Sequence, residues 1–220
     1  MTYTDRRAAG AILAERLSAY AGPSADEVDR SSALVLGLVR GGVPVAAAIA
    51  DALRLPLDAL VVRKLGVPWA PEVAFGALGP TGVQVLNEQV SSRLTPAEIE
   101  MVLRQEAAEL VRREQIFRSD RPPLDLTGHD ALVIDDGLAT GATARAAVEV
   151  ARRLGAARVV LAVPVGSAQA VHHLREVADE VVCPWVPHHF DAVSRFYKSF
   201  PQVSDGEVVA LLSDRHIHKP

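Results

Sequence analysis

Apolar positions along the chain switch between two spacings, one typical of amphipathic helices and one typical of buried strands. Helical spacing predicts a helix from Asp5 to Tyr20. Continuous apolar runs predict buried strands at Ala33–Val39 and Leu57–Val62, and a helix from Pro44 to about Arg54 lies between them. A strand, a helix and a second strand in this order predict a right-handed parallel crossover.

The same alternation resumes in the second half of the chain. Strands are predicted at 131–135, 157–165 and 179–185, and helices at 143–155 and 168–178. The whole pattern predicts an α/β fold with a doubly wound, mainly parallel sheet. The last segment, from Pro187, contains several aromatic residues and a short helix ending near Leu212. We expect it to form a small cap over one edge of the sheet, together with the N-terminal segment.

The middle of the chain lacks the alternation of buried strands and helices and is rich in Gly and Pro. The stretch Gly66–Gly82 contains four Gly and three Pro, which predicts a mobile loop plus a hairpin rather than a core element. We expect this hairpin, at about 66–88, to act as a lid. Thr95 and Glu98 form a capping-box pattern that opens a long, solvated helix ending near Phe117. The expected organisation is one domain over 1–220, with a core at about 30–184 and a C-terminal cap at about 185–215.

Composition narrows the class of protein. The 220 residues are 49% hydrophobic and carry a net charge of −4, so no basic field indicates a nucleic-acid partner. The longest apolar stretch, Gly42–Ala50, is far shorter than the roughly 18 residues of a membrane span, and the opening MTYTDRR has no hydrophobic signal core. We expect a soluble, cytoplasmic protein without a membrane partner. The single cysteine, Cys183, lies in an apolar run and is interpreted as a buried thiol.

The most informative motif is VIDDGLATGAT, which begins in a predicted strand. Ligands of parallel α/β sheets bind beyond the carboxyl ends of the strands, and this strand ends in two adjacent carboxylates, Asp135 and Asp136. The residues that follow are Gly137, Leu138, Ala139, Thr140, Gly141, Ala142 and Thr143. Glycines let backbone N–H groups turn inward, the next helix contributes its positive end, and two threonines add hydroxyls. These features predict a phosphate cradle.

Two further strand ends carry cations. Arg40, Gly41 and Gly42 follow the first strand, and the glycines permit close approach of a ligand to the backbone. Arg63 and Lys64 follow the second strand and would stabilise a departing anion. Neither a Walker loop nor a Gly-x-Gly-x-x-Gly motif is found in the sequence, so nucleotide triphosphatase and dehydrogenase chemistry are not indicated.

The strings LVRGGVPVAAAIA, VVRKLGVPWAPE and VIDDGLATGAT resemble the type I phosphoribosyltransferase family, and most closely a bacterial subgroup of it. Val39 departs from the proline expected in that subgroup. The resemblance implies that Asp135 and Asp136 bind the ribose hydroxyls of phosphoribosyl pyrophosphate (PRPP), and that residues 137–143 hold its 5′-phosphate. It also implies that residues 40–42 form the pyrophosphate loop, with a cis or strained Val39–Arg40 peptide, and that Arg63 and Lys64 reach the pyrophosphate.

The same resemblance implies a Mg²⁺-dependent transfer of ribose 5-phosphate to a nitrogenous base or related acceptor, with release of pyrophosphate. Mg²⁺ would be held by Asp135 and Asp136, mainly through water, and Arg40 and Lys64 would stabilise the leaving group. Ala139 stands where 6-oxopurine enzymes of the family carry an acid, which disfavours hypoxanthine or guanine. The candidates for acceptor contacts are Trp69, Glu72, Trp185, Phe190 and Tyr197.

Other functions remain open from the sequence. A PRPP-binding regulatory or sensor domain without transferase activity would keep the cradle, and a hydrolase acting on PRPP or a nucleotide would use the same residues. Retention of Arg40, Arg63 and Lys64 favours the transferase, because a sensor does not require leaving-group chemistry. The sequence does not identify the acceptor, and it is compatible with a monomer or a homodimer.

Overall fold

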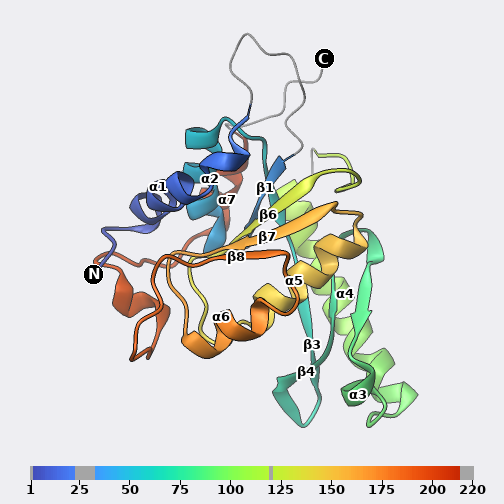
Figure 1. The fold of residues 1–220 in the computed structure, drawn as a ribbon. Helices are drawn as coiled ribbons and strands as arrows, with labels where there is room; N and C mark the ends of the chain where they lie inside the picture. Colours follow the sequence, from blue (N-terminus) through green and yellow to red (C-terminus); the bar gives the residue numbers. More distant parts are fainter. Residues whose placement is uncertain (1, 23–32, 119–120, 214–220) are drawn as a thin grey trace.

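A computed structural model of the chain describes residues 2–22, 33–118 and 121–213, and a five-stranded parallel sheet lies at its centre (Figure 1). The strands stand in the order β2-β1-β6-β7-β8 and every neighbouring pair is parallel. Their bounds are β1 Ala33–Leu38, β2 Leu57–Leu60, β6 Asp130–Ile134, β7 Arg158–Ala162 and β8 Glu180–Val182. The predicted parallel α/β sheet is confirmed.

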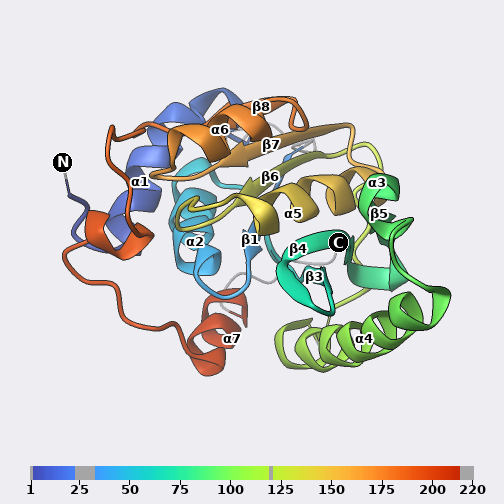
Figure 2. The same cartoon turned by 90° about the horizontal axis from the view of Figure 1, so that it is seen from below.

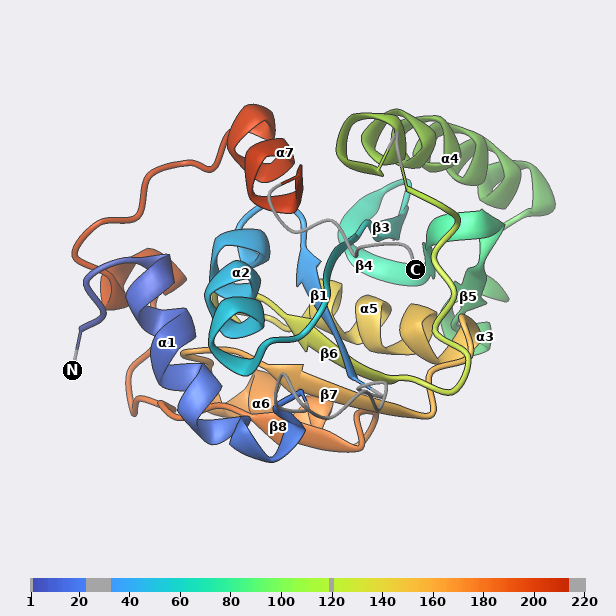
Figure 3. The same ribbon diagram turned by 90° about the horizontal axis from the view of Figure 1, so that it is seen from above.

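Helices cover both faces of this sheet (Figure 3). Alternate side chains of the strands point into two separate apolar clusters; Val35 packs toward α1 and α2, whereas Leu36 packs toward α5 and α6. Because both faces of the strands are buried, the sequence shows continuous apolar runs rather than alternation. The helix bounds are α1 Arg6–Arg16, α2 Gly42–Leu53, α5 Ala142–Arg153 and α6 Ala168–Leu174.

The strand order reverses between β1 and β6. From β1 the chain first proceeds outward to β2, and it later returns to place β6 on the other side of β1. In open α/β sheets, ligands bind in the crevice outside the carboxyl ends of the strands at such a reversal. The two loops that flank this crevice are residues 39–41, after β1, and residues 135–141, after β6.

The Gly- and Pro-rich middle of the chain forms a second, antiparallel sheet, in the order β3-β4-β5. The strands are β3 Arg63–Val67, β4 Ala70–Leu78 and β5 Gln84–Leu86, and the 3₁₀ turn η2 Pro80–Gly82 precedes β5. The expected hairpin is present, but the prediction that this stretch contributes no core element was wrong. Phe75 is fully buried and Leu78 nearly so, because the second half of β4 packs into the main apolar clusters.

Two helices follow this sheet and lie beside it (Figure 2). They are α3 Glu88–Ser91 and α4 Pro96–Arg118. The capping box is confirmed: the Thr95 N–H donates to Glu98 Oε2 at 2.8 Å, and the Glu98 N–H donates to Thr95 Oγ1 at 3.3 Å. These hydrogen bonds lower the pKa of Glu98. Most of α4 is exposed or half-buried, as expected for a solvated helix.

The N-terminal segment meets the segment that follows β8 in the expected cap (Figure 1). Tyr3 pairs with Tyr197 in a parallel bridge, and the Lys198 N–H donates to the Tyr3 carbonyl at 2.8 Å. The 3₁₀ turns η1 Ser18–Tyr20 and η3 Val193–Phe196 and the helix α7 Asp205–Ser213 complete the elements. The proposed domain limits at about 30 and 215 fall outside the described residues. Among the helices described, none is long and apolar enough to cross a membrane.

Candidate functional site

The loop after β6 presents the two predicted carboxylates at the crevice. The Asp136 N–H donates to Asp135 Oδ1 at 2.9 Å, and the Tyr197 hydroxyl donates to the Asp136 carbonyl at 2.7 Å. The loop is fixed to the neighbouring strand end, because the Leu138 N–H donates to the Val165 carbonyl at 2.9 Å. Both acids are therefore held by the sheet and the cap.

The rest of this loop has the geometry of an anion cradle. Gly141 has a φ of 77°, in the left-handed region that favours glycine, and it directly precedes α5. Among the described residues, none accepts a hydrogen bond from the backbone N–H of Thr140, Gly141 or Thr143. The Thr140 and Thr143 residues are exposed. Free donors at a helix N-terminus favour an anion.

The loop after β1 approaches the acids closely. The Val39–Arg40 peptide is cis, as predicted. A Cβ at Gly41 would lie 2.2 Å from Asp136 Oδ2, and one at Gly42 would lie 2.3 Å from the Ile134 carbonyl oxygen. A side chain at residue 42 would collide with the backbone of β6, and one at residue 41 would displace the Asp136 carboxylate, so the contact between the two loops depends on both glycines.

A cation that sequence reasoning missed lies against the acids. Arg6, at the start of α1, donates from Nε to Asp136 Oδ2 at 2.9 Å and from Nη1 to the Pro201 carbonyl at 2.7 Å. Its guanidinium carbon lies 3.7 Å from the centre of the Phe200 ring. No local pattern marks Arg6, because its partners are 130 and 195 residues away in the sequence.

The electrostatics of the acid pair favour a bound cation. Burial and the neighbouring Asp136 raise the pKa of Asp135. Burial also raises the pKa of Asp136, and the Arg6 guanidinium opposes that rise. Two adjacent carboxylates that resist ionisation together would be stabilised by additional positive charge.

A cavity of about 510 Å³ connects these groups with the cap. It is lined by Arg6, Arg40, Gly41, Asp135, Asp136, Ser194, Phe200, Pro201, Gln202 and Val203. Arg40 Nη1 lies 3.5 Å from Asp205 Oδ1, at the start of α7. The structure thus brings together Arg40, Gly41 and the acid pair, and adds a wall from the cap that the sequence did not reveal.

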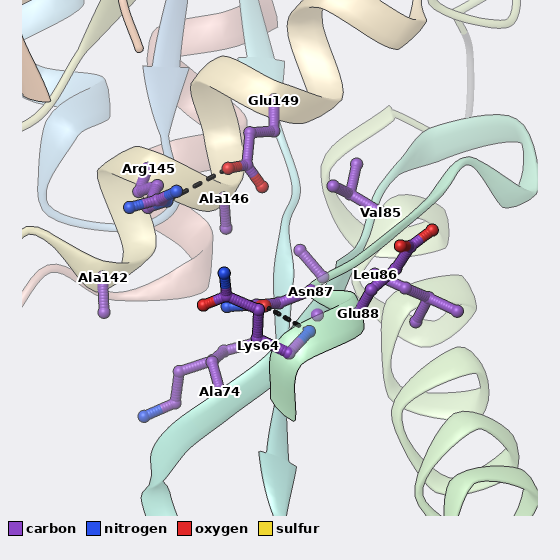
Figure 4. Close-up of a pocket in the computed structure, with 13 residues that line it drawn as sticks. Lys64, Ala74, Val85, Leu86, Asn87, Glu88, Ala142, Arg145, Ala146 and Glu149 are labelled. Atoms are coloured by element: carbon purple, nitrogen blue, oxygen red, sulfur yellow. Dashed lines mark hydrogen bonds and ion pairs between the residues drawn. The ribbon is translucent and has the colours of Figure 1, made fainter. Parts of the chain in front are cut away.

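Arg63 and Lys64 do not point to the same place. Arg63 binds Glu106 of α4, with Nε at 2.7 Å from Oε2. Lys64 lines a second cavity of about 560 Å³, whose facing wall includes Ala142 and Arg145 of α5 (Figure 4). Neighbouring residues of a strand face opposite sides, so β3 separates this pair.

The aromatic candidates for acceptor contacts take different positions. Trp69 is 63% exposed at the tip of the β3–β4 hairpin. Trp185 and Phe190 both pack on Phe196, with ring centroids 4.7 Å and 5.3 Å apart, inside the aromatic cluster of the cap. None of the three lines the cavity at the acids. Phe200, which does line it, was missed because its position depends on Arg6.

Glu72 lies in β4, and its side chain is outside the described part of the structure. Burial raises the pKa of the Cys183 thiol to about 11, and Sγ contacts the Trp185 carbonyl at 3.4 Å. A thiol with a raised pKa is a poor nucleophile, although Cys183 is half-buried and not fully buried as predicted.

Known proteins have sequences similar to that of this chain. A family described as "Phosphoribosyl transferase domain" matches residues 8–196. Two Mycobacterium tuberculosis proteins, "Putative phosphoribosyl transferase MT0597" and "Putative phosphoribosyl transferase Rv0571c", are each 50% identical over 216 residues, which are 97% of this chain and 47% of theirs. The chain therefore spans about half the length of these curated relatives.

A solved structure is also closely similar. The crystal structure of the protein TT1426 from Thermus thermophilus is 40% identical, with a TM-score of 0.87. The similarity covers 98% of this chain and 99% of that one, so it extends over the central sheet, the hairpin and the cap alike.

Proposed function

Because this chain belongs to the phosphoribosyl transferase domain family, we propose that it transfers ribose 5-phosphate from PRPP to a nitrogenous base or related acceptor and releases pyrophosphate. The observation that carries this proposal is the meeting of an acid pair, an anion cradle and the Arg40 loop where the strand order reverses between β1 and β6. Each of these parts suits one portion of PRPP.

The sugar and its phosphate would bind to the loop after β6. Carboxylates accept hydrogen bonds from hydroxyls, so Asp135 and Asp136 would orient the ribose through its 2′- and 3′-hydroxyls. The 5′-phosphate would bind at residues 139–143, where the backbone N–H groups of Thr140, Gly141 and Thr143 donate to no described residue. These contacts position the sugar carbon that reacts, without a protein nucleophile.

The residues present also fit Mg²⁺ held largely by ligand and water oxygens. No group of three potential ligands that could bind a metal alone is found among the described residues. The adjacent carboxylates of Asp135 and Asp136 provide hard oxygen ligands, and burial raises the pKa of both, so a bound cation would favour their ionised forms. When bound there, Mg²⁺ would neutralise charge on the pyrophosphate.

In the transfer, the bond between ribose carbon 1 and a pyrophosphate oxygen breaks, and the electron pair leaves with pyrophosphate. An acceptor nitrogen forms the new bond to carbon 1 and gives up its proton to solvent. Arg40 lies on the cavity wall, where its charge would stabilise the departing anion. Ala139 supplies no acid to manage the acceptor proton, which still disfavours 6-oxopurines.

The proposed activity is tested by incubating the protein with PRPP, Mg²⁺ and a panel of bases while pyrophosphate and nucleotide are both measured. Pyrophosphate and nucleotide formed in equal amounts support the transferase. Pyrophosphate or ribose 5-phosphate without nucleotide, for every base, indicates hydrolysis. Binding of PRPP without any turnover indicates the sensor alternative and contradicts the proposal.

We further propose that the tip of the β3–β4 hairpin closes over bound PRPP. Lys64 lies at the base of the hairpin, paired with Ala77, and lines a cavity adjoining the anion cradle at Ala142, so it would face the ligand that the tip covers. The buried Phe75 anchors the base of the hairpin, which limits the moving part to the tip around Trp69. Closure would shield the reacting carbon from water.

This closure predicts a change at Trp69 when PRPP and Mg²⁺ bind. The chain has two tryptophans, so a Trp185→Phe variant isolates the fluorescence of Trp69. We expect a blue shift of its emission, because a side chain now 63% exposed becomes covered, and slower proteolysis near the tip. Inorganic phosphate alone is the control ligand. An emission spectrum indifferent to saturating PRPP would show that the hairpin is static.

A further inference from the structure

Arg6 connects three parts of the chain that meet only in the folded protein. Its guanidinium binds the Asp136 carboxylate, the Pro201 carbonyl and the face of the Phe200 ring. The residue is only 8% exposed, although its charge would normally keep it at the surface. A buried cation with three defined partners has a fixed position.

This contact restricts the carboxylate of Asp136 from one side. Gly41 lies close to the same carboxylate oxygen, because even a methyl group at that position would collide with Oδ2. Both Arg6 and the Gly41 backbone therefore lie against Oδ2, and one of the two carboxylate oxygens is already engaged. Such a carboxylate presents its remaining acceptor sites in one orientation.

The same guanidinium also places the cap. Phe200 and Pro201 form part of the cavity wall and belong to an extended segment without regular secondary structure. Arg6 contacts both of them directly and so determines how close this wall lies to the acids. A change at Arg6 should alter the carboxylate and the wall together.

We propose that Arg6 is a positioning residue for sugar binding: it orients Asp136 toward the ribose hydroxyls and fixes the cap wall beside them. This inference rests on the proposed function, because it assumes that a ribose binds at the acids. It predicts that Arg6 matters for ligands that contain the sugar and matters little for a ligand that fills the phosphate cradle alone.

The test compares ribose 5-phosphate with inorganic phosphate as calorimetric ligands of the full chain with Mg²⁺. Arg6→Gln should weaken the binding of ribose 5-phosphate by about tenfold, which is the effect of one lost charge-assisted hydrogen bond. The affinity for inorganic phosphate should change by no more than about twofold. Arg6→Lys keeps the charge but cannot bind both partners at once, and we expect an intermediate loss. The matched control is Arg7→Gln, which removes the same charge from an exposed neighbour on α1.

Circular dichroism and thermal melting establish that each variant is folded. If Arg6→Gln fails to fold, Arg6→Lys carries the test, with a several-fold loss for ribose 5-phosphate alone as the expected result. If the binding of both ligands is weakened equally, or if the binding of ribose 5-phosphate is unchanged, the positioning role of Arg6 is overturned. Failure of the unmodified protein to bind ribose 5-phosphate or PRPP would instead overturn the proposed function, and this inference with it.

Discussion

The double variant Asp135→Asn, Asp136→Asn is expected to lose Mg²⁺-dependent PRPP binding and to turn over about a thousandfold more slowly. Asparagine keeps the size of each side chain but removes both ionisable carboxyl groups from a site where burial strengthens their interaction with a bound cation. The amide also offers a single oxygen acceptor in place of two carboxylate oxygens. Calorimetry with PRPP, in the presence and absence of Mg²⁺, measures the binding loss directly.

The matched control for this loss is Asp130→Asn, at the opposite end of the same strand, β6. It removes a carboxylate from the strand without touching the cavity, so we expect PRPP binding to be unchanged. The two single variants at Asp135 and Asp136 separate the contributions of the acids. A folded double variant that titrates PRPP like the unmodified protein would remove the diol-binding role from both residues.

The parts of the site that sequence reasoning found share one property: their geometry is local. Asp135 and Asp136 follow a continuous apolar run, and such a run ends at the edge of the sheet where ligands bind. Gly41 follows the first strand in the same manner. These residues could be identified because the strand that carries each of them also determines where it lies.

The missed parts depend on contacts between distant segments. Arg6 and Phe200 meet only when the N-terminal helix and the cap pack together, and nothing in the spacing of either segment encodes that contact.

The hairpin was predicted incorrectly for a different reason. Counting Gly and Pro concealed the strand character of Ala70–Leu78. Val73 is exposed and Phe75 is buried although they are two residues apart, because the pairing of β4 with β3 changes register beside Phe75. Arg63 and Lys64 were treated as a pair because the start of β3 was not recognised.

A buried ion-pair network around Asp58, which the sequence did not reveal, leads to the largest expected change in stability. Asp58, in the edge strand β2, accepts hydrogen bonds from Arg118 Nε at 3.0 Å and Arg118 Nη2 at 3.1 Å. Arg121 Nη1 lies 3.3 Å from the same carboxylate. Arg121 also donates to the carbonyls of Leu57 and Leu212, at 2.8 Å and 2.6 Å, so this group ties β2 to the end of α4 and to α7.

Asp58→Asn should therefore lower the free energy of unfolding by about 3 kcal/mol, because it removes the carboxylate that two buried guanidinium groups share. Arg118 keeps its longer contact with Glu114, at 3.6 Å. For a chain of this length, that change corresponds to a melting temperature lower by roughly 10 °C. Denaturant unfolding and thermal melting both measure this loss of stability.

The matched control is Glu100→Gln, which breaks the exposed ion pair between Glu100 and Arg104 on α4 and should have no measurable effect on stability. The contrast follows from burial: the side chains of Asp58 and Arg118 are 9% and 5% exposed, whereas those of Glu100 and Arg104 are 63% and 76% exposed. If the two variants melt at the same temperature, the buried network does not stabilise the junction of β2, α4 and α7.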